Sequence, residues 1–156
     1  MEFEYFLVDV FTKNPLEGNA LAVFPDARRL DDATMQAIAR EMNLSETTFV
    51  FPPTHAKFAA RVRIFTPNYE MVFAGHPTIG TASVIQRKGL VPRGEAAFVL
   101  EENVGGVPVR IEAGDNPLIW LRTPSIERGM QFDRAVCAAA LGLDERDLLP
   151  DVPCEL

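Results

Sequence analysis

The stretch Met71-Val-Phe-Ala-Gly-His-Pro-Thr-Ile-Gly-Thr-Ala-Ser-Val-Ile-Gln86 decides the fold, because it runs from a strand into a helix without one Asp, Glu, Lys or Arg. Pro77 suits the first helical position, where a missing N–H costs nothing, so the pattern predicts His76 as the N-cap. Thr78 and Ile79 would then present unpaired N–H groups at the positive end of the helix dipole. A small carboxylate is the natural ligand of such a helix start. The alternative is a core helix that binds nothing.

The interior of this helix offers no polar face to water. Its side chains are small or apolar on every side, which predicts a helix wrapped by a sheet. Gly80 lies in the middle of the helix, where it costs about 1 kcal/mol relative to alanine. A glycine is tolerated there when another backbone or strand passes close by, so we expect a strand to lie against Gly80.

The composition indicates one globular domain with a sizeable core, because 47% of the 156 residues are apolar and 24% are charged. The net charge of −7 disfavours nucleic acid as a partner. The longest charge-poor run is too short, and too interrupted by Gly, His and Pro, to span a membrane. An acidic start without an apolar signal segment predicts a cytoplasmic protein. Cys137 and Cys154 form no metal-binding motif, so no metal is expected.

The remaining pattern predicts an α+β fold. A one-sided helix begins at Asp31 or Asp32 and ends at Asn43, and a second amphipathic helix covers 131–141. A turn is expected at Asp115-Asn-Pro117. Strand-like runs occupy residues 3–11, 20–24, 44–51, 58–65, 71–73, 96–100, 107–112 and 118–122.

Taken singly, the polar residues beside these strands favour ordinary roles. Gly18-Asn19 reads as a turn where the chain re-enters the sheet. Glu46 stands at the mouth of a hydroxylic and apolar strand, where an isolated glutamate is usually solvated. The alternative for Glu46 is a general base. Arg61 and Arg63 alternate with apolar residues, which favours a solvated face over an anion site.

Three segments together resemble a known family. They are Gly18-Asn-Ala-Leu-Ala-Val23, Asn43-Leu-Ser-Glu-Thr-Thr-Phe-Val50, and Phe65-Thr-Pro67 followed by Phe73-Ala-Gly-His-Pro-Thr-Ile-Gly-Thr-Ala82. In this order and spacing they resemble the PhzF-like isomerases of phenazine biosynthesis. The resemblance covers essentially the whole chain as the amino-terminal half of such an enzyme. It implies a mixed, mostly antiparallel sheet rolled around a central helix, which is one half of a diaminopimelate-epimerase-like fold.

The resemblance also implies roles for particular residues. Glu46 matches the family's acid/base glutamate, Gly75 and His76 match its substrate-holding helix start, and Asn19 matches an asparagine in the cleft. The family moves a proton on a cyclic amino-hydroxy acid without a cofactor. Two departures, Ala20 in place of proline and Met71-Val72 in place of Leu-Pro, remove no reacting group. The chemistry agrees, because proton removal near a carboxylate needs a base and fixed donors for the developing anion.

The whole second half of the family's proteins has no counterpart in residues 1–156, and three interpretations therefore stay open. The chain acts as a cofactor-independent isomerase on a small cyclic or amino carboxylic acid. Alternatively, it is a non-catalytic domain that binds a small carboxylate. A third interpretation is a structural half that works only with a complementary carboxyl-terminal half or with its own copy as a homodimer. A nucleotide site is disfavoured, because Thr81 stands where a P-loop requires lysine.

Overall fold

The computed structural model describes residues 2–91, 96–114 and 117–155. It divides the chain into a unit that ends at Pro124 and a smaller unit that begins at Ser125. The larger unit contains β1 (Phe6–Val10), β2 (Asn19–Phe24), α1 (Asp32–Met42), β3 (Glu46–Phe51), β4 (Ala60–Phe65), β5 (Glu70–Met71), α2 (Gly75–Arg87), β6 (Ala97–Glu102), β7 (Gly105–Ile111) and β8 (Ile119–Leu121). The expected turn at residues 115–117 lies partly outside the described residues.

One mixed sheet organises the larger unit in the strand order β1-β2-β3-β4-β6-β7-β8, with β5 paired to β4. The pairs β2–β3 and β4–β6 are parallel and the others are antiparallel. A parallel pair needs a long crossover connection, and each of these two pairs is separated in sequence by a helix, α1 and α2 respectively. The structure confirms the predicted α+β fold with a mostly antiparallel sheet.

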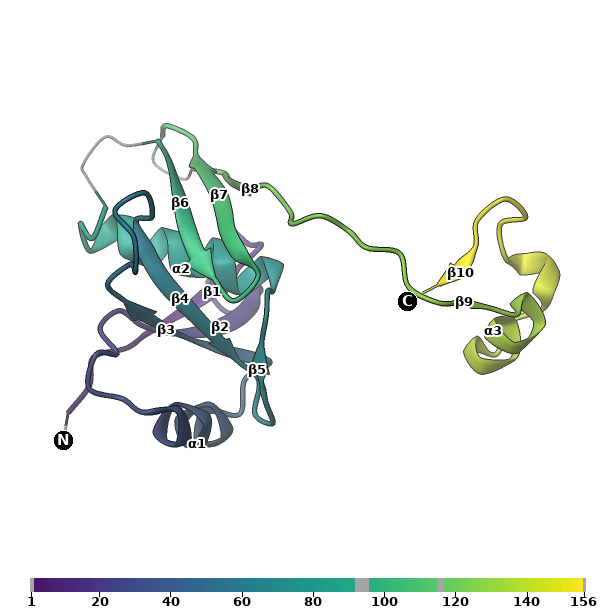
Figure 1. Ribbon diagram of the computed structural model, residues 1–156, viewed down its shortest axis with the longest axis horizontal. Coiled ribbons are helices and arrows are strands. Elements are labelled where there is room, and N and C mark those ends of the chain that lie inside the picture. The colour runs from purple at the N-terminus through teal and green to yellow at the C-terminus, as the bar shows by residue number, and fades with distance from the viewer. Residues whose placement is uncertain (1, 92–95, 115–116, 156) are drawn as a thin grey trace. The chain divides into compact units, whose positions relative to one another are not determined.

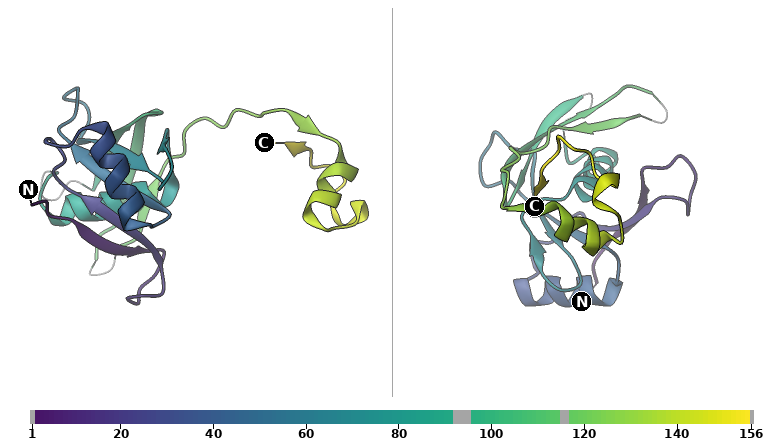
Figure 2. Two further views of the ribbon diagram at one scale, coloured as in Figure 1. Left: turned by 90° about the horizontal axis from the view of Figure 1, so that it is seen from below. Right: turned by 90° about the vertical axis from the view of Figure 1, so that its right-hand side faces the viewer.

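The two helices cover opposite faces of this sheet (Figure 1). The curled face wraps α2, which contacts β1, β2, β3 and β8, whereas α1 packs across β3 and β4 on the outer face (Figure 2). Strand alternation separates the two cores, because Val62 and Ile64 face α2 while Phe65 faces α1. We refer below to the α2 side as the inner face and to the α1 side as the outer face.

Helix α1 begins and ends where the sequence indicates. The Asp31 side chain accepts a hydrogen bond from the Thr34 N–H, which makes Asp31 the N-cap. Asn43 closes the helix in the left-handed conformation with φ of 50°, a conformation that asparagine adopts more readily than most residues.

Helix α2 begins two residues earlier than predicted. Its N-cap is Ala74, which is extended with φ of −154° and ψ of 136°, so His76 lies inside the first turn and Pro77 is the third helical residue. The Thr78 N–H already donates to the Ala74 carbonyl at 3.3 Å. The prediction that Thr78 offers a free N–H is therefore wrong. Because proline has no N–H, the open donors of the first turn are those of Gly75 and His76.

The interior of α2 is buried, as the sequence predicts. A Cβ atom on Gly80 would lie 2.6 Å from Leu21 Cδ2 and 2.9 Å from Val10 Cγ2. The helix therefore touches β1 and β2 at this glycine, which confirms the expected close approach of a strand.

A buried hydroxyl pair joins α2 to the sheet. Thr48 Oγ1 on β3 and Thr81 Oγ1 on α2 lie 2.8 Å apart, and both residues are fully buried. Changing either residue alone to valine leaves the other hydroxyl without this partner, so each single variant is expected to lose about 1–3 kcal/mol of unfolding free energy. The double variant, which removes both polar groups, is expected to lose less than the sum. Urea titrations of the four proteins measure these values, and strict additivity would show that the pair contributes nothing.

The smaller unit contains β9 (Gln131–Phe132), α3 (Arg134–Leu141), a 3₁₀ turn η1 (Glu145–Asp147) and β10 (Cys154–Glu155). β9 and β10 pair antiparallel. The guanidinium of Arg134 donates to the backbone carbonyls of Leu148, Leu149 and Val152, and so ties the start of α3 to the segment that leads to β10.

Candidate functional site

Glu46 and His76 meet at the start of α2. Glu46 is the first residue of β3, and His76 is the second residue of α2. Glu46 Oε2 lies 3.4 Å from His76 Nδ1, and the two side chains are only 16% and 9% exposed. The sequence separates them by thirty positions, and the crossover from β4 through β5 into α2 brings them together.

Each of these side chains has one buried polar atom that makes no hydrogen bond. Apart from the 3.4 Å approach of His76 Nδ1 to Glu46 Oε2, which is too long and poorly aligned to count as a hydrogen bond, Glu46 Oε2 and His76 Nε2 have no partner in the described part of the chain and are inaccessible to solvent. Buried polar atoms in proteins are almost always paired, so two such atoms on adjacent side chains mark a place where a ligand can supply the missing bonds.

Asn19, also a predicted site residue, lies on the strand beside β3, and Gly75 directly precedes His76 in α2. Asn19 is the exposed first residue of β2, and Leu21, two positions further, pairs with Glu46 in the parallel register. Asn19 and Glu46 therefore stand at the same ends of neighbouring strands, and both face inward by alternation. Gly75 opens α2, and apart from its chain neighbours and the backbone of its own helix no described atom lies within 4 Å of the position a Cβ would take there.

A close backbone contact, and not the turn conformation, requires a glycine at position 18. A Cβ on Gly18 would lie 2.5 Å from the carbonyl oxygen of Val10, well inside contact distance. Only glycine allows the chain to pass so close to the end of β1 before Asn19 enters β2. The backbone approach at Gly18 thus fixes where Asn19 begins its strand.

Phe11 is a neighbour of the site that sequence reasoning missed. Its ring centroid lies 6.5 Å from that of His76, and the residue is 73% exposed. Its φ of 65° is unusual for a bulky residue and turns the chain sharply at the end of β1. The alternation of β1 gives no sign of this turn, because a positive φ has no sequence signature outside Gly, Asn and Asp.

Burial favours the neutral form of the His76 ring. Removal from water lowers its pKa from 6.5, while the Glu46 carboxylate and the Ala20 carbonyl favour the protonated ring and oppose this effect. The imidazole is therefore neutral at pH 7 and has one donor and one acceptor nitrogen. Beside the positive end of the α2 dipole, this side chain can bind the carboxylate or carbonyl of a ligand.

We expect the ring of His76 to titrate below pH 6.5, because its burial disfavours the charged form. Replacing Glu46 with glutamine removes the favourable carboxylate and should lower this pKa further. Ring-proton NMR signals of His76, followed from pH 4 to 8 in the wild-type chain and in Glu46→Gln, measure both values. A His76 pKa at or above 6.5, or one that rises in Glu46→Gln, would contradict the geometry.

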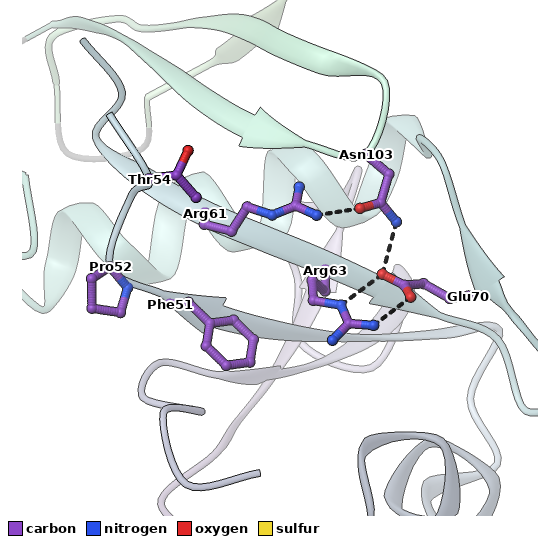
Figure 3. A pocket seen from close by; sticks show the side chains of 7 residues that line it. All are labelled: Phe51, Pro52, Thr54, Arg61, Arg63, Glu70 and Asn103. Atoms are coloured by element: carbon purple, nitrogen blue, oxygen red, sulfur yellow. Dashed lines mark hydrogen bonds and ion pairs between the residues drawn. The ribbon is translucent and has the colours of Figure 1, made fainter. Parts of the chain in front are cut away.

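The pocket in Figure 3 is separate from this group. It is an open depression of about 400 Å³ on the outer face, lined by Phe51, Pro52, Thr54, Arg61, Arg63, Glu70 and Asn103. Arg63 binds Glu70 through Nε and Nη2 at 2.7 and 2.5 Å, and its Nη1 binds Asp32 at 2.6 Å. Its side chain is only 19% exposed, so the prediction of a solvated face is wrong for Arg63. Two carboxylates already neutralise its charge, which leaves little attraction for an anion.

The described ranges hold no group of three or more His, Cys, Asp or Glu side chains arranged to bind a metal ion. Over those same ranges, no helix is both long enough and apolar enough to cross a membrane.

Comparisons with known proteins identify relatives of this chain. An uncharacterized isomerase of Mesorhizobium japonicum is 53% identical over 150 residues, covering 92% of this chain and 48% of the relative. A trans-2,3-dihydro-3-hydroxyanthranilate isomerase of Pseudomonas aeruginosa is 44% identical over 142 residues, covering 89% and 49%. The chain thus spans about half the length of these curated relatives.

Solved structures show the same fold. A predicted epimerase of Pseudomonas aeruginosa matches with a TM-score of 0.81 at 34% identity, covering 99% of this chain and 55% of that one. A probable proline racemase of Agrobacterium radiobacter matches with a TM-score of 0.51 at 16% identity, covering 63% of this chain and 36% of that one, which shows a similar fold. A family model described as phenazine biosynthesis-like protein matches residues 8–156, and the chain belongs to this PhzC-PhzF family.

Proposed function

We propose that this chain forms the amino-terminal half of a cofactor-independent isomerase that moves a proton on a small carboxylic acid. Glu46 is the acid/base group in this proposal, and Asn19, Gly75 and His76 hold the substrate. The observation that carries the proposal is the pair of buried, unpartnered atoms, Glu46 Oε2 and His76 Nε2, at the start of α2. The isomerase names of the matched relatives support the reaction class.

The chemistry proceeds by two proton transfers. The Glu46 carboxylate takes a proton from a substrate carbon, so a C–H bond breaks and an O–H bond forms while negative charge spreads into the substrate. The N–H groups of Gly75 and His76, with the helix dipole behind them, stabilise this charge. Glu46 then returns its proton to a different carbon of the same substrate. The substrate keeps its atoms and its oxidation level, so no cofactor is required.

The substrate class follows from the name of the Pseudomonas aeruginosa relative, which acts on trans-2,3-dihydro-3-hydroxyanthranilate. This compound is a cyclic acid with an amino and a hydroxyl group. We propose a substrate of the same class here, with its carboxylate at the α2 start and its ring towards Asn19.

Solvent deuterium tests this reaction. The chain is incubated in D₂O with trans-2,3-dihydro-3-hydroxyanthranilate, with a chelator present and no cofactor added. Isomerised product that carries solvent deuterium on carbon is expected, because a proton held by a carboxylate exchanges with solvent. Tight binding in calorimetry without product or deuterium exchange, both for the chain alone and for the chain supplied with its second half, would instead identify a non-catalytic domain that binds a carboxylate.

A separate proposal concerns the partner that completes this half. It rests on the finding that the chain covers about half of each of these curated relatives. We propose that a complementary carboxyl-terminal half, or a second copy of the chain as a homodimer, closes the site. Two copies would place two Glu46 carboxylates near one cleft, where like charge disfavours ionisation of both. Sedimentation should show a dimer, or a complex with the separately expressed second half. A monomer that turns over substrate at full rate would contradict this proposal.

A further inference from the structure

Glu102 is a buried carboxyl group that the proposed proton transfer does not use. It is the last residue of β6, it faces inward, and it is 3% exposed. Its Oε2 is shielded from solvent and has no hydrogen-bond partner among the described residues. A glutamate in such surroundings needs a structural reason, since an isolated buried carboxylate is strongly disfavoured.

Glu102 reaches the first turn of α2 through one hydroxyl group. Thr78 Oγ1 lies 2.7 Å from Glu102 Oε1 and 2.7 Å from the carbonyl oxygen of Ala74. Ala74 is the N-cap of α2, and no side chain caps the helix there. The Thr78 hydroxyl therefore links the carboxyl group directly to the backbone from which Gly75 and His76 extend.

The Thr78 hydroxyl group has a single proton, and this determines the protonation state of Glu102. A hydroxyl group has one proton to donate, and the Ala74 carbonyl can only accept. A carboxylate can also only accept, so Thr78 cannot satisfy the carbonyl and an ionised Glu102 together. Both 2.7 Å contacts are hydrogen bonds only when Thr78 donates to Ala74 and a protonated Glu102 donates to Thr78.

We propose that Glu102 is a positioning residue, which in its protonated form donates to Thr78 and thereby holds the Ala74 carbonyl and the first turn of α2 in place. When Glu102 ionises, the Thr78 hydroxyl turns towards it and the Ala74 carbonyl loses this bond. The open N–H groups of Gly75 and His76 then lose part of their fixed geometry. The value of this geometry for catalysis rests on the proposed function, whereas the hydrogen-bond relay does not.

The surroundings of Glu102 allow its proton to be lost near neutral pH. Burial raises its pKa to about 7, against the smaller opposing effects of the Thr78 hydrogen bond and the charge of Arg61 on β4. Arg61 itself binds Asn103 and the Glu101 carbonyl. On β7 the partner of Glu102 is Gly105, which has no charge.

Two further ionisable groups lie on the elements around Glu102. His76 is the ionisable group in the first turn of α2, and Glu70 on β5, which Asn103 contacts, is bound to Arg63.

NMR of the ¹⁵N-labelled chain from pH 5 to 9 tests this relay without any substrate. The backbone amide signals of Gly75 and Thr78 are expected to shift with a midpoint of about 7. Glu102→Gln should abolish this transition and keep both signals at their low-pH positions, because the glutamine amide donates to Thr78 as the acid does. Thr78→Val should also abolish the transition, whereas Thr78→Ser should retain it.

The matched control is Glu101→Gln. Glu101 neighbours Glu102 on the same strand but points to the outer face, where its carboxylate binds Thr54. This variant should keep the wild-type transition. His76 is followed by its own ring signals, so that its titration is subtracted from that of the amides. The inference is overturned if the amides of Gly75 and Thr78 show no transition near pH 7, or if the transition persists in Glu102→Gln. Neither result depends on whether the chain isomerises a substrate.

Discussion

Replacing Glu46 with glutamine is expected to slow isomerisation by about 10²- to 10⁴-fold, the usual contribution of a positioned acid/base group. Glutamine has nearly the same shape but cannot accept a proton from carbon. Glu46 lies 3.4 Å from His76, and an amide of the same size can occupy this position. We therefore expect β3 to stay folded in the variant. The loss should therefore appear in kcat, with a smaller change in KM.

A steady-state assay with trans-2,3-dihydro-3-hydroxyanthranilate measures this loss, on the chain supplied with its second half where that half is required. Glu41→Gln is the matched control, because Glu41 is an exposed glutamate on α1. It should leave the rate unchanged. Circular dichroism and the unfolding midpoint should be similar for all three proteins. Glu46→Gln that retains activity while folded would remove Glu46 from the mechanism.

Replacing Glu102 with glutamine is expected to remove the loss of stability that Glu102 itself imposes between pH 4.5 and 7. Burial raises the pKa of Glu102 from 4.5 to about 7, so the unfolded chain releases this proton first as the pH rises. The folded state binds the extra proton within this window, and the unfolding free energy therefore falls across it. The full cost, about 3 kcal/mol, is present above pH 7 and absent below pH 4.5.

The difference between wild type and Glu102→Gln isolates this effect from other titrating groups. At pH 5 the two proteins should have similar unfolding free energies, because glutamine resembles the neutral acid. At pH 8 the variant should be more stable by as much as about 3 kcal/mol. Urea unfolding at half-unit steps of pH gives both curves, and Glu101→Gln should follow wild type. A difference that stays constant with pH would show that Glu102 is ionised in the folded chain.

Local signals in the sequence predict most of the larger unit. The N-cap Asp31, the left-handed Asn43 and the glycine contact at Gly80 each depend on residues whose preferences act within a few positions. Helix α2 begins two residues before the position that Pro77 indicates, because proline is also tolerated later in the first turn, where its missing N–H removes no helical bond.

The features that sequence reasoning missed depend on pairings between distant strands. The strand predicted at 96–100 stops short of Glu102, and only the observed pairing of β6 and its packing against α2 bury this residue against Thr78. Arg63 reads as surface until Glu70 on β5 and Asp32 on α1 are placed beside it. Spacing alone likewise gives no reason to join Glu46 to His76. The family resemblance named both residues, and the crossover through α2 shows how the fold brings them together.

If Glu46, His76 and the open start of α2 form one binding site for a carboxylic acid, NMR titration of the labelled chain with trans-2,3-dihydro-3-hydroxyanthranilate should reveal it. The signals of the Gly75 amide, the His76 ring and the Glu46 carboxyl carbon are expected to shift together, with a single dissociation constant. Shifts confined to the outer-face pocket around Arg61 and Arg63, or no shifts at saturating acid, would show that these groups do not bind the acid.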